Sequence, residues 1–116
     1  MLAKKFRLQI QEWFAPYLNL SAGLKEKRNT ITRKSDFFIV KFRANDLLFS
    51  RFGTVISAKV SKGAVKRNKI KRIIFDFIRL NKYYKMPGKD ALIIVLPKII
   101  ELKKNEIEKE IEIILQ

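Results

Sequence analysis

The stretch AVKRNKIKRIIFDFIR, residues 64–79, has to suit both a protein core and solvent, because it combines many apolar residues with many basic ones. At about 100° per residue, five apolar side chains share one arc of about 140°: Ile70, Ile73, Ile74, Phe77 and Ile78. The opposite side carries Asn68, Arg72, Phe75 and Arg79. The pattern predicts a helix over residues 63–81, capped by Ser61, with one face in the core and the other in solvent.

The positive charge around this helix is dense and has no acidic counterpart. From Lys59 to Arg72, seven of fourteen residues are Lys or Arg and none is acidic. The chain carries a net charge of +15, but its last sixteen residues carry −2, so the preceding hundred carry +17. Such a field opposes compaction unless an anion neutralises it, and nucleic acid is the usual partner. Asn68 supports this interpretation, because it is a poor helix former that offers paired hydrogen bonds.

The composition excludes several kinds of chemistry. There is no cysteine and no histidine, which removes thiolate nucleophiles, Cys-based zinc sites and the side chain best suited to acid–base catalysis near neutral pH. The acids outside the C-terminal stretch are scattered: Glu12, Glu26, Asp36, Asp46, Asp76 and Asp90. They form no carboxylate cluster for a two-metal nuclease. We therefore expect that the protein has no metal site. We also expect that any reaction it takes part in is carried out by a partner.

Three stretches have the β-branched and aromatic composition of strands. DFFIVKFR, residues 36–43, is the first, and SRFGTVISAKV, residues 50–60, is predicted as its hairpin partner across a turn at Asn45–Asp46. ALIIVL, residues 91–96, is a continuous apolar run typical of a strand buried on both faces, and Pro97 ends it. Alternation places Phe38, Val40 and Phe42 on one side of the first strand.

Amphipathic patterns predict a short helix of about residues 8–15 and a C-terminal helix over 104–115. Residues 19–35 have loop composition, with room for a short extra strand in 24–33. The predicted elements follow one another in the order α-β-β(-β)-α-β-α. This order indicates an α+β fold, a small α/β sandwich in which helices partly cover one sheet. At 116 residues, the chain is expected to form a single domain, 1–116. The first twenty residues lack the apolar run of a signal peptide, and nothing approaches a membrane span, so we expect a cytoplasmic protein.

SAKVSKGAVKRNKIKRIIFDFIR resembles the hallmark of the bacterial ribonuclease P protein component, whose pattern includes A-V-x-R-N-x-x-K-R. Six residues match as they stand: Ala64, Val65, Arg67, Asn68, Lys71 and Arg72. Lys69 stands where the family usually has Arg, and Ala58 replaces the first Lys of its S-K-K run. MLAKKFRL and PGKDALIIVLP are similar to two further family segments, so the resemblance covers most of residues 1–8 and 36–116.

The resemblance implies a subunit of a ribonucleoprotein enzyme. The family protein binds ribonuclease P RNA, which with Mg²⁺ cleaves the 5′ leader from precursor tRNA, so the protein itself holds no catalytic residue. It also implies a left-handed βαβ crossover through the basic helix. The residues expected to bind RNA are Lys59, Lys62, Lys66, Arg67, Asn68, Lys69, Lys71, Arg72 and Arg79.

The resemblance further implies a cleft for the single-stranded leader, between the first helix and the sheet. Its candidates are Trp13, Phe14, Tyr17, Phe37, Ile39, Lys41 and Arg51, a mixture of apolar and basic groups on which bases stack and cations follow the backbone. Core packing is the competing role for the aromatic residues. Phe75 is either an exposed stacking platform or a filler against the C-terminal helix.

Two other functions remain open on the sequence. A ribosomal-type RNA-binding protein with no enzymatic partner would share the basic helix and sheet, although it would not require Arg67–Asn68 with Lys71–Arg72. A helix-in-groove DNA regulator needs a second helix linked by a turn just before the recognition helix, and the strand predicted before Ser61 argues against that.

Overall fold

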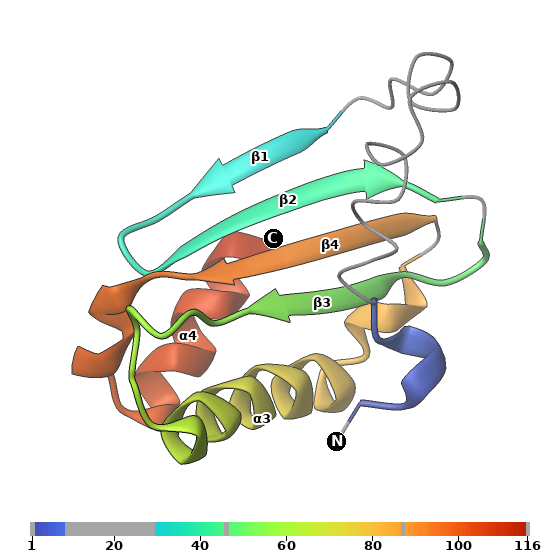
Figure 1. Ribbon diagram of the computed structural model, residues 1–116. Helices are drawn as coiled ribbons and strands as arrows, with labels where there is room; N and C mark the ends of the chain where they lie inside the picture. Colours follow the sequence, from blue (N-terminus) through green and yellow to red (C-terminus); the bar gives the residue numbers. More distant parts are fainter. Residues whose placement is uncertain (1, 9–29, 46, 87, 116) are drawn as a thin grey trace, which may run out of the picture.

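A computed structural model describes residues 2–8, 30–45, 47–86 and 88–115. A four-stranded sheet, ordered β1-β2-β4-β3, is covered on one face by two helices (Figure 1). The strands are β1 Ile31–Lys34, β2 Phe38–Ala44, β3 Arg51–Val55 and β4 Lys89–Val95. Within the described residues, the helices are α3 Ala64–Leu80 and α4 Lys104–Leu115, with 3₁₀ turns η1 Lys4–Phe6, η2 Tyr83–Lys85 and η3 Pro97–Glu101. The α+β sandwich expected from the sequence is confirmed. Of the helix predicted over 8–15, Leu8 is described and is not helical, and residues 9–15 lie outside the described residues.

The predicted hairpin, in which residues 36–43 pair with residues 50–60, is wrong: these segments form β2 and β3, which are not neighbours in the sheet. β4 lies between them, antiparallel to β2 and parallel to β3, so that Ala91 faces both Phe42 and Phe52. β4 is the most continuously apolar strand, and the centre of the sheet is where a strand is covered on both faces. α3 is therefore the crossover between the parallel neighbours β3 and β4 that the resemblance implies.

The short extra strand is confirmed as β1, which pairs antiparallel with β2. β3 is shorter than predicted, because residues 58–60 form a turn in which the Val60 N–H donates to the Ser57 carbonyl. The chain has to leave the sheet there in order to reach α3. Ser61 does not cap α3: Gly63 is the N-cap residue, and Ser61 Oγ instead accepts a 3.3 Å hydrogen bond from the Gly63 N–H.

The core lies between the sheet and the two helices. Phe38, Val40 and Phe42 of β2 are buried there, which confirms the predicted alternation. α3 contributes Ile70, Ile74, Phe77 and Ile78, and α4 contributes Ile107, Ile111, Ile114 and Leu115. The two helices therefore together cover the inward face of the sheet.

Phe75 departs from the predicted helix faces. Its side chain is only 2% exposed and belongs to the buried core, although periodicity places it on the basic side. The same core includes Leu2 and Val60, which precede α3 in the chain. The core thus draws on segments other than the sheet and α4, and the buried arc of α3 is wider than the sequence pattern predicts.

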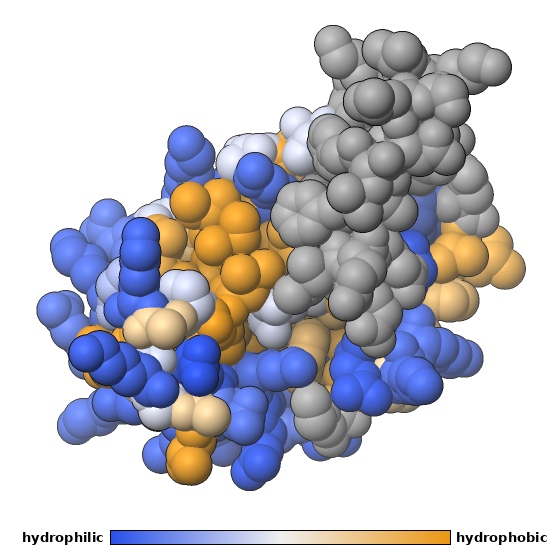
Figure 2. Space-filling model, viewed as in Figure 1, coloured by the Kyte–Doolittle hydropathy of each residue, from blue (hydrophilic) through white to orange (hydrophobic). Residues whose placement is uncertain are grey.

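The face of the sheet away from the helices has its own small apolar cluster. Leu8 and Leu92 are buried there, with Val55 and Ile94 packed against them. Figure 2 shows an apolar area on this side of the molecule, bordered by hydrophilic side chains. The N-terminal segment reaches this face through Leu8, whose N–H donates a 2.8 Å hydrogen bond to the Phe52 carbonyl.

Gly53 is required for this approach, and replacing it with alanine should destabilise the fold by about 1–3 kcal/mol. An added Cβ would lie 2.8 Å from the backbone oxygen of Leu8 and 3.3 Å from its Cβ, so the N-terminal segment would have to move. We expect a lower melting temperature and faster hydrogen exchange, with a larger loss of protection at the Leu8 amide than at the amides that join β2 to β4. Full protection of the Leu8 amide in Gly53→Ala would show that the segment is held in another way.

Candidate nucleic-acid interface

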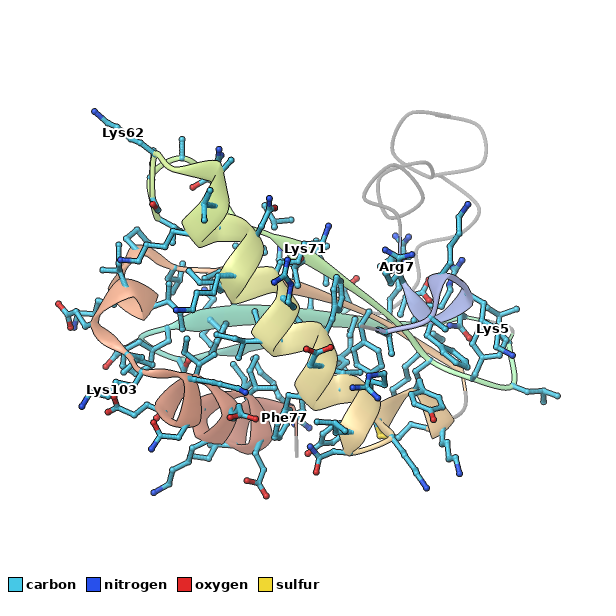
Figure 3. The ribbon with its side chains drawn as sticks, turned by 90° about the horizontal axis from the view of Figure 1, so that it is seen from below. Lys5, Arg7, Lys62, Lys71, Phe77 and Lys103 are labelled. Carbon is cyan, nitrogen blue, oxygen red and sulfur yellow. The ribbon has the colours of Figure 1, made fainter. Side chains whose placement is uncertain are left out.

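The nine residues predicted to bind RNA lie along α3 and the turn that leads into it. Figure 3 shows Lys62 just before the first turn of α3 and Lys71 near its middle. Arg67 and Lys71 are partly buried. The other seven are exposed: Lys59, Lys62, Lys66, Asn68, Lys69, Arg72 and Arg79. The structure therefore brings seven of the nine onto α3, whose other side is held in the core, and places Lys59 and Lys62 in the segment just before it.

Within the described ranges, no cation from Lys59 to Arg72 forms an ion pair. Arg79 lies 3.9 Å from Asp76, at the limit of a salt bridge. The Lys71 ammonium lies 5.8 Å from the ring centroid of Phe75, so its stem covers the buried ring while its charge stays near the surface. Arg67 Nε is buried and has no hydrogen-bond partner among the described residues. Most of this positive charge is thus not neutralised by the residues that the structure describes, and it is available to a polyanion.

The N-terminal segment supplies cations that the sequence interpretation did not assign. Lys4 and Lys5 are exposed in η1, and Arg7 forms an isolated bridge with Phe52 of β3. Figure 3 shows Lys5 and Arg7 at the other end of the molecule from Lys62. Exposed cations are therefore also present away from the start of α3. The KKFR run in the opening residues carried this signal, since it places three cations within four positions.

The candidates for the leader cleft divide into four groups. Ile39 and Lys41 of β2 are partly buried and pair in register with Ile94 and Leu92, on the side of the sheet facing away from the helices. Phe37 is placed differently: it precedes β2 in a bend and packs against the core on the helix side. Its predicted position beside Ile39 is wrong, because strand alternation does not extend into the bend. Trp13, Phe14 and Tyr17 lie outside the described residues.

Arg51, the remaining cleft candidate, is held by a carboxylate. Its Nε and Nη2 donate 2.9 Å and 2.8 Å hydrogen bonds to the two oxygens of Asp90, which is 3% exposed. The Asn45 amide donates a third bond, of 2.7 Å, to the same carboxylate. Asp90 therefore joins the ends of β2, β3 and β4. Sequence reasoning treated it as one of the scattered acids.

The acids of the described residues do not assemble into a metal site. No three side chains of the His, Cys, Asp or Glu type are grouped there as potential ligands. The one buried carboxylate of that part of the chain, Asp90, already accepts hydrogen bonds from Arg51 and Asn45. Its lone pairs are used in holding the strands together.

Comparison with known families gives the context for this arrangement. The family model described as Ribonuclease P matches residues 25–116, which include the basic helix and every strand of the sheet. The chain belongs to the ribonuclease P protein family. Its sheet order, with α3 crossing between β3 and β4, is therefore the arrangement of a ribonuclease P protein.

Curated relatives in this family are moderately similar. The ribonuclease P protein component of Syntrophobacter fumaroxidans is 33% identical over 102 residues, covering 84% of this chain and 85% of the relative. That of Syntrophus aciditrophicus is 36% identical over 78 residues, covering 67% and 65%, respectively. That of Thermotoga maritima is 38% identical over 68 residues, covering 59% and 57%. The matched segment thus spans less than two thirds of the length of the last two relatives.

Solved structures of the family have the same fold. The RNase P protein of Thermotoga maritima is 25% identical, with a TM-score of 0.69, and the match covers 93% of this chain and 94% of that protein. The RNase P protein of Staphylococcus aureus has a TM-score of 0.74 at 23% identity, covering 95% and 92%. The second match bears on the fold alone.

Proposed function

We propose that this chain is the protein subunit of a ribonuclease P ribonucleoprotein, in which it binds the RNA subunit and the 5′ leader of precursor tRNA. The observation that carries the proposal is the exposed basic side of α3. It presents Asn68, Lys69 and Arg72 on a helix whose other side is fixed in the core, in a chain of this family. A rigid helix of this kind offers cations at set positions to the phosphates of a folded RNA.

In this proposal, α3 contacts the RNA subunit, and the protein carries no catalytic residue. The RNA, with Mg²⁺, hydrolyses the phosphodiester that releases the leader. The N-terminal end of α3 adds backbone donors and the positive end of its dipole to the charges of Lys62 and Lys66. These features favour phosphate binding and have no role in bond cleavage.

The leader is assigned to the sheet face away from the helices. Ile39 and Ile94, which are only partly buried, give this face an apolar surface over the buried Leu92, and Lys41 adds a positive charge beside it. Unstacked bases bind to apolar surfaces while cations follow their phosphates, without sequence preference. We place the protein in the cytoplasm with its tRNA substrate. No helix in the described ranges is long and apolar enough to cross a bilayer.

Reconstitution with a bacterial ribonuclease P RNA tests the proposal. At low Mg²⁺ concentration, where the RNA alone cleaves slowly, the protein should stimulate cleavage of precursor tRNA. The stimulation should be larger for a substrate with a long leader than for one with a single leader nucleotide. Tight RNA binding without stimulation would favour the ribosomal-type alternative, and the absence of binding would contradict both.

A further inference from the structure

A pocket of about 140 Å³ lies between α3, η3 and the start of α4, on the helix side of the molecule. Its apolar floor comes from three elements: Ile70 of α3 is 4% exposed, Ile99 of η3 is 1% exposed and Ile107 of α4 is 3% exposed. Ile100 lies at the pocket with 43% of its surface exposed. The pocket is therefore an apolar depression with a rigid base, open at one side.

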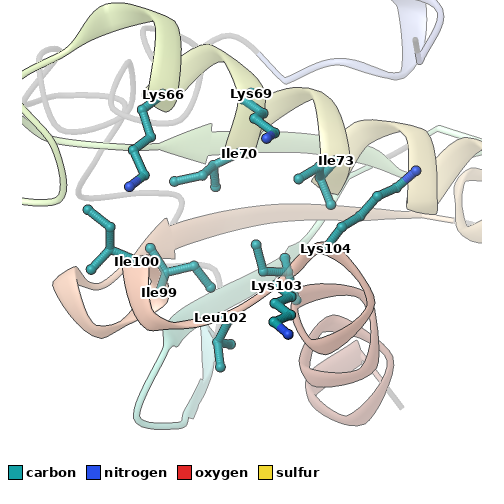
Figure 4. Close-up of a pocket in the computed structure, with 10 residues that line it drawn as sticks. Lys66, Lys69, Ile70, Ile73, Ile99, Ile100, Leu102, Lys103 and Lys104 are labelled. Carbon is teal, nitrogen blue, oxygen red and sulfur yellow. The ribbon is translucent and has the colours of Figure 1, made fainter.

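Four lysines line this pocket, and no acidic residue does. Lys66 and Lys69 come from α3, and Lys103 and Lys104 come from the start of α4. Figure 4 shows Lys66 extending from α3 toward η3 and Lys104 extending from α4 toward α3. Glu101 and Glu106, the nearest acids in the sequence, are not part of the lining. Among the described residues, none of these four lysines forms an ion pair.

The placement of Lys103 and Lys104 works against helix stability. The N-terminus of a helix is its positive end, where acidic side chains are favoured and lysines are not. Glu106 partly compensates, because its Oε1 accepts a 2.9 Å hydrogen bond from the Lys103 N–H. The two lysines still add charge beside a positive helix end and opposite the lysines of α3. An anion bound among them would remove this repulsion.

We infer that this lysine-rimmed pocket binds one unstacked nucleotide of the RNA partner, with the base on the isoleucine floor and its flanking phosphates between the lysines. The inference rests on the proposed function, which supplies the RNA. Lys66 and Lys69 belong both to the pocket and to the basic side of α3, so RNA lying on α3 reaches the pocket without leaving that surface. The positive charge of the pocket and its position beside the basic side of α3 therefore both favour RNA as its ligand.

The size and chemistry of the pocket suit a single base. Its volume is below the roughly 300–1,000 Å³ of pockets that enclose drug-sized ligands, so a whole cofactor would not be enclosed. Proteins read RNA chiefly at unpaired nucleotides whose bases are turned out of the stack, and such bases also pack between apolar side chains. The lining includes no side chain that accepts hydrogen bonds, so the pocket holds a base without selecting its identity.

A pair of matched substitutions tests the inference. Ile100→Glu places a negative charge at the pocket, and Ile113→Glu makes the same change at a 58% exposed position of α4 outside the lining. Binding to a bacterial ribonuclease P RNA should weaken by about 10- to 100-fold in Ile100→Glu, and by only a few-fold in Ile113→Glu. Chemical probing with dimethyl sulfate, a carbodiimide and kethoxal, which together react with all four unpaired bases, should find one base that is protected by the wild type and by Ile113→Glu, and reactive with Ile100→Glu.

Each other outcome has a definite meaning. Equal binding by the two variants would contradict RNA binding at the pocket and would leave the proposed function unaffected. Weaker binding by Ile100→Glu with no change in base reactivity would show only a charge effect, and it would contradict the binding of a nucleotide in the pocket. Failure of the wild type to bind the RNA would remove the proposed function, and the pocket's ligand with it. If Ile100→Glu melts early, the neutral pair Ile100→Gln and Ile113→Gln repeats the comparison.

Discussion

Replacing Arg67 and Arg72 together with alanine should weaken binding to ribonuclease P RNA by roughly 10²- to 10⁴-fold and leave the protein folded. Hydrogen bonds to charged groups contribute about 1.5–3 kcal/mol each, and two phosphate contacts would be lost. Arg72 is exposed on α3, and the buried Nε of Arg67 has no partner in the described ranges, so neither change breaks an ion pair there. Filter binding or fluorescence anisotropy measures the loss, and a thermal melt checks the fold.

The salt dependence of binding separates lost phosphate contacts from a general loss of affinity. A wild-type interface with roughly 6–10 phosphate contacts should lose about 10³–10⁵ in affinity between 50 and 200 mM salt. The double variant should have a shallower slope of log K against log salt, by about 0.7–0.9 for each contact removed. An unchanged slope would mean that these arginines do not contact phosphates.

The matched control is Lys34→Ala with Lys109→Ala. It removes the same net charge from exposed positions on β1 and α4, away from α3. Its loss of affinity should be much smaller than that of the α3 variant, because long-range attraction is screened over roughly 8 Å at physiological salt. Equal losses in the two double variants would show that net charge alone, with no localised interface, drives the binding. An unfolded α3 variant would mean that the core face of this helix was misassigned.

Replacing Asp90 with alanine should cost about 3 kcal/mol of the free energy of unfolding. Removing one member of a buried ion pair costs about 3–5 kcal/mol, because the remaining charge loses the interaction that offset its desolvation. The lower end applies, since the Arg51 side chain is 23% exposed and water still reaches part of it. The Asn45 amide, buried beside the carboxylate, loses its 2.7 Å hydrogen bond as well. Urea denaturation measures the change.

Asp36→Ala is the matched control, because Asp36 is exposed in the bend before β2. It should change stability by no more than about 0.5 kcal/mol. Arg51→Ala combined with Asp90→Ala should be more stable than the sum of the single effects predicts, by about 0.5–3 kcal/mol of coupling. Strictly additive effects would show that Arg51 and Asp90 do not stabilise one another, whatever their geometry.

Local sequence patterns predicted the parts of this protein that depend on near neighbours. The bounds of α4 agree with the prediction, and those of α3 agree to within one residue at each end. The burial of Phe38, Val40 and Phe42 followed from period-two alternation, and the exposure of Asn68 and Arg72 followed from helical periodicity. Each of these features is set by residues a few positions apart, whose spacing is visible in the chain.

The same reasoning failed where a residue's surroundings come from distant segments. Phe75 has the spacing of a solvent-facing residue, yet its cluster includes Leu2 and Val60, from outside the helix. Arg51 looked like a cation available to RNA until the fold placed Asp90 against it, 39 residues later in the chain. The position of β4 between β2 and β3 likewise depends on which strand gains most from cover on both faces.

By itself, the sequence determined that a basic, amphipathic helix would bury one side and expose cations on the other, because charge and periodicity are properties of neighbouring residues. Only the tertiary structure decided the order of the strands, the ion pair of Arg51 and the pocket where lysines of α3 meet those of α4. These features arise from contacts between segments far apart in the chain, and no local pattern encodes which distant surface a side chain will meet.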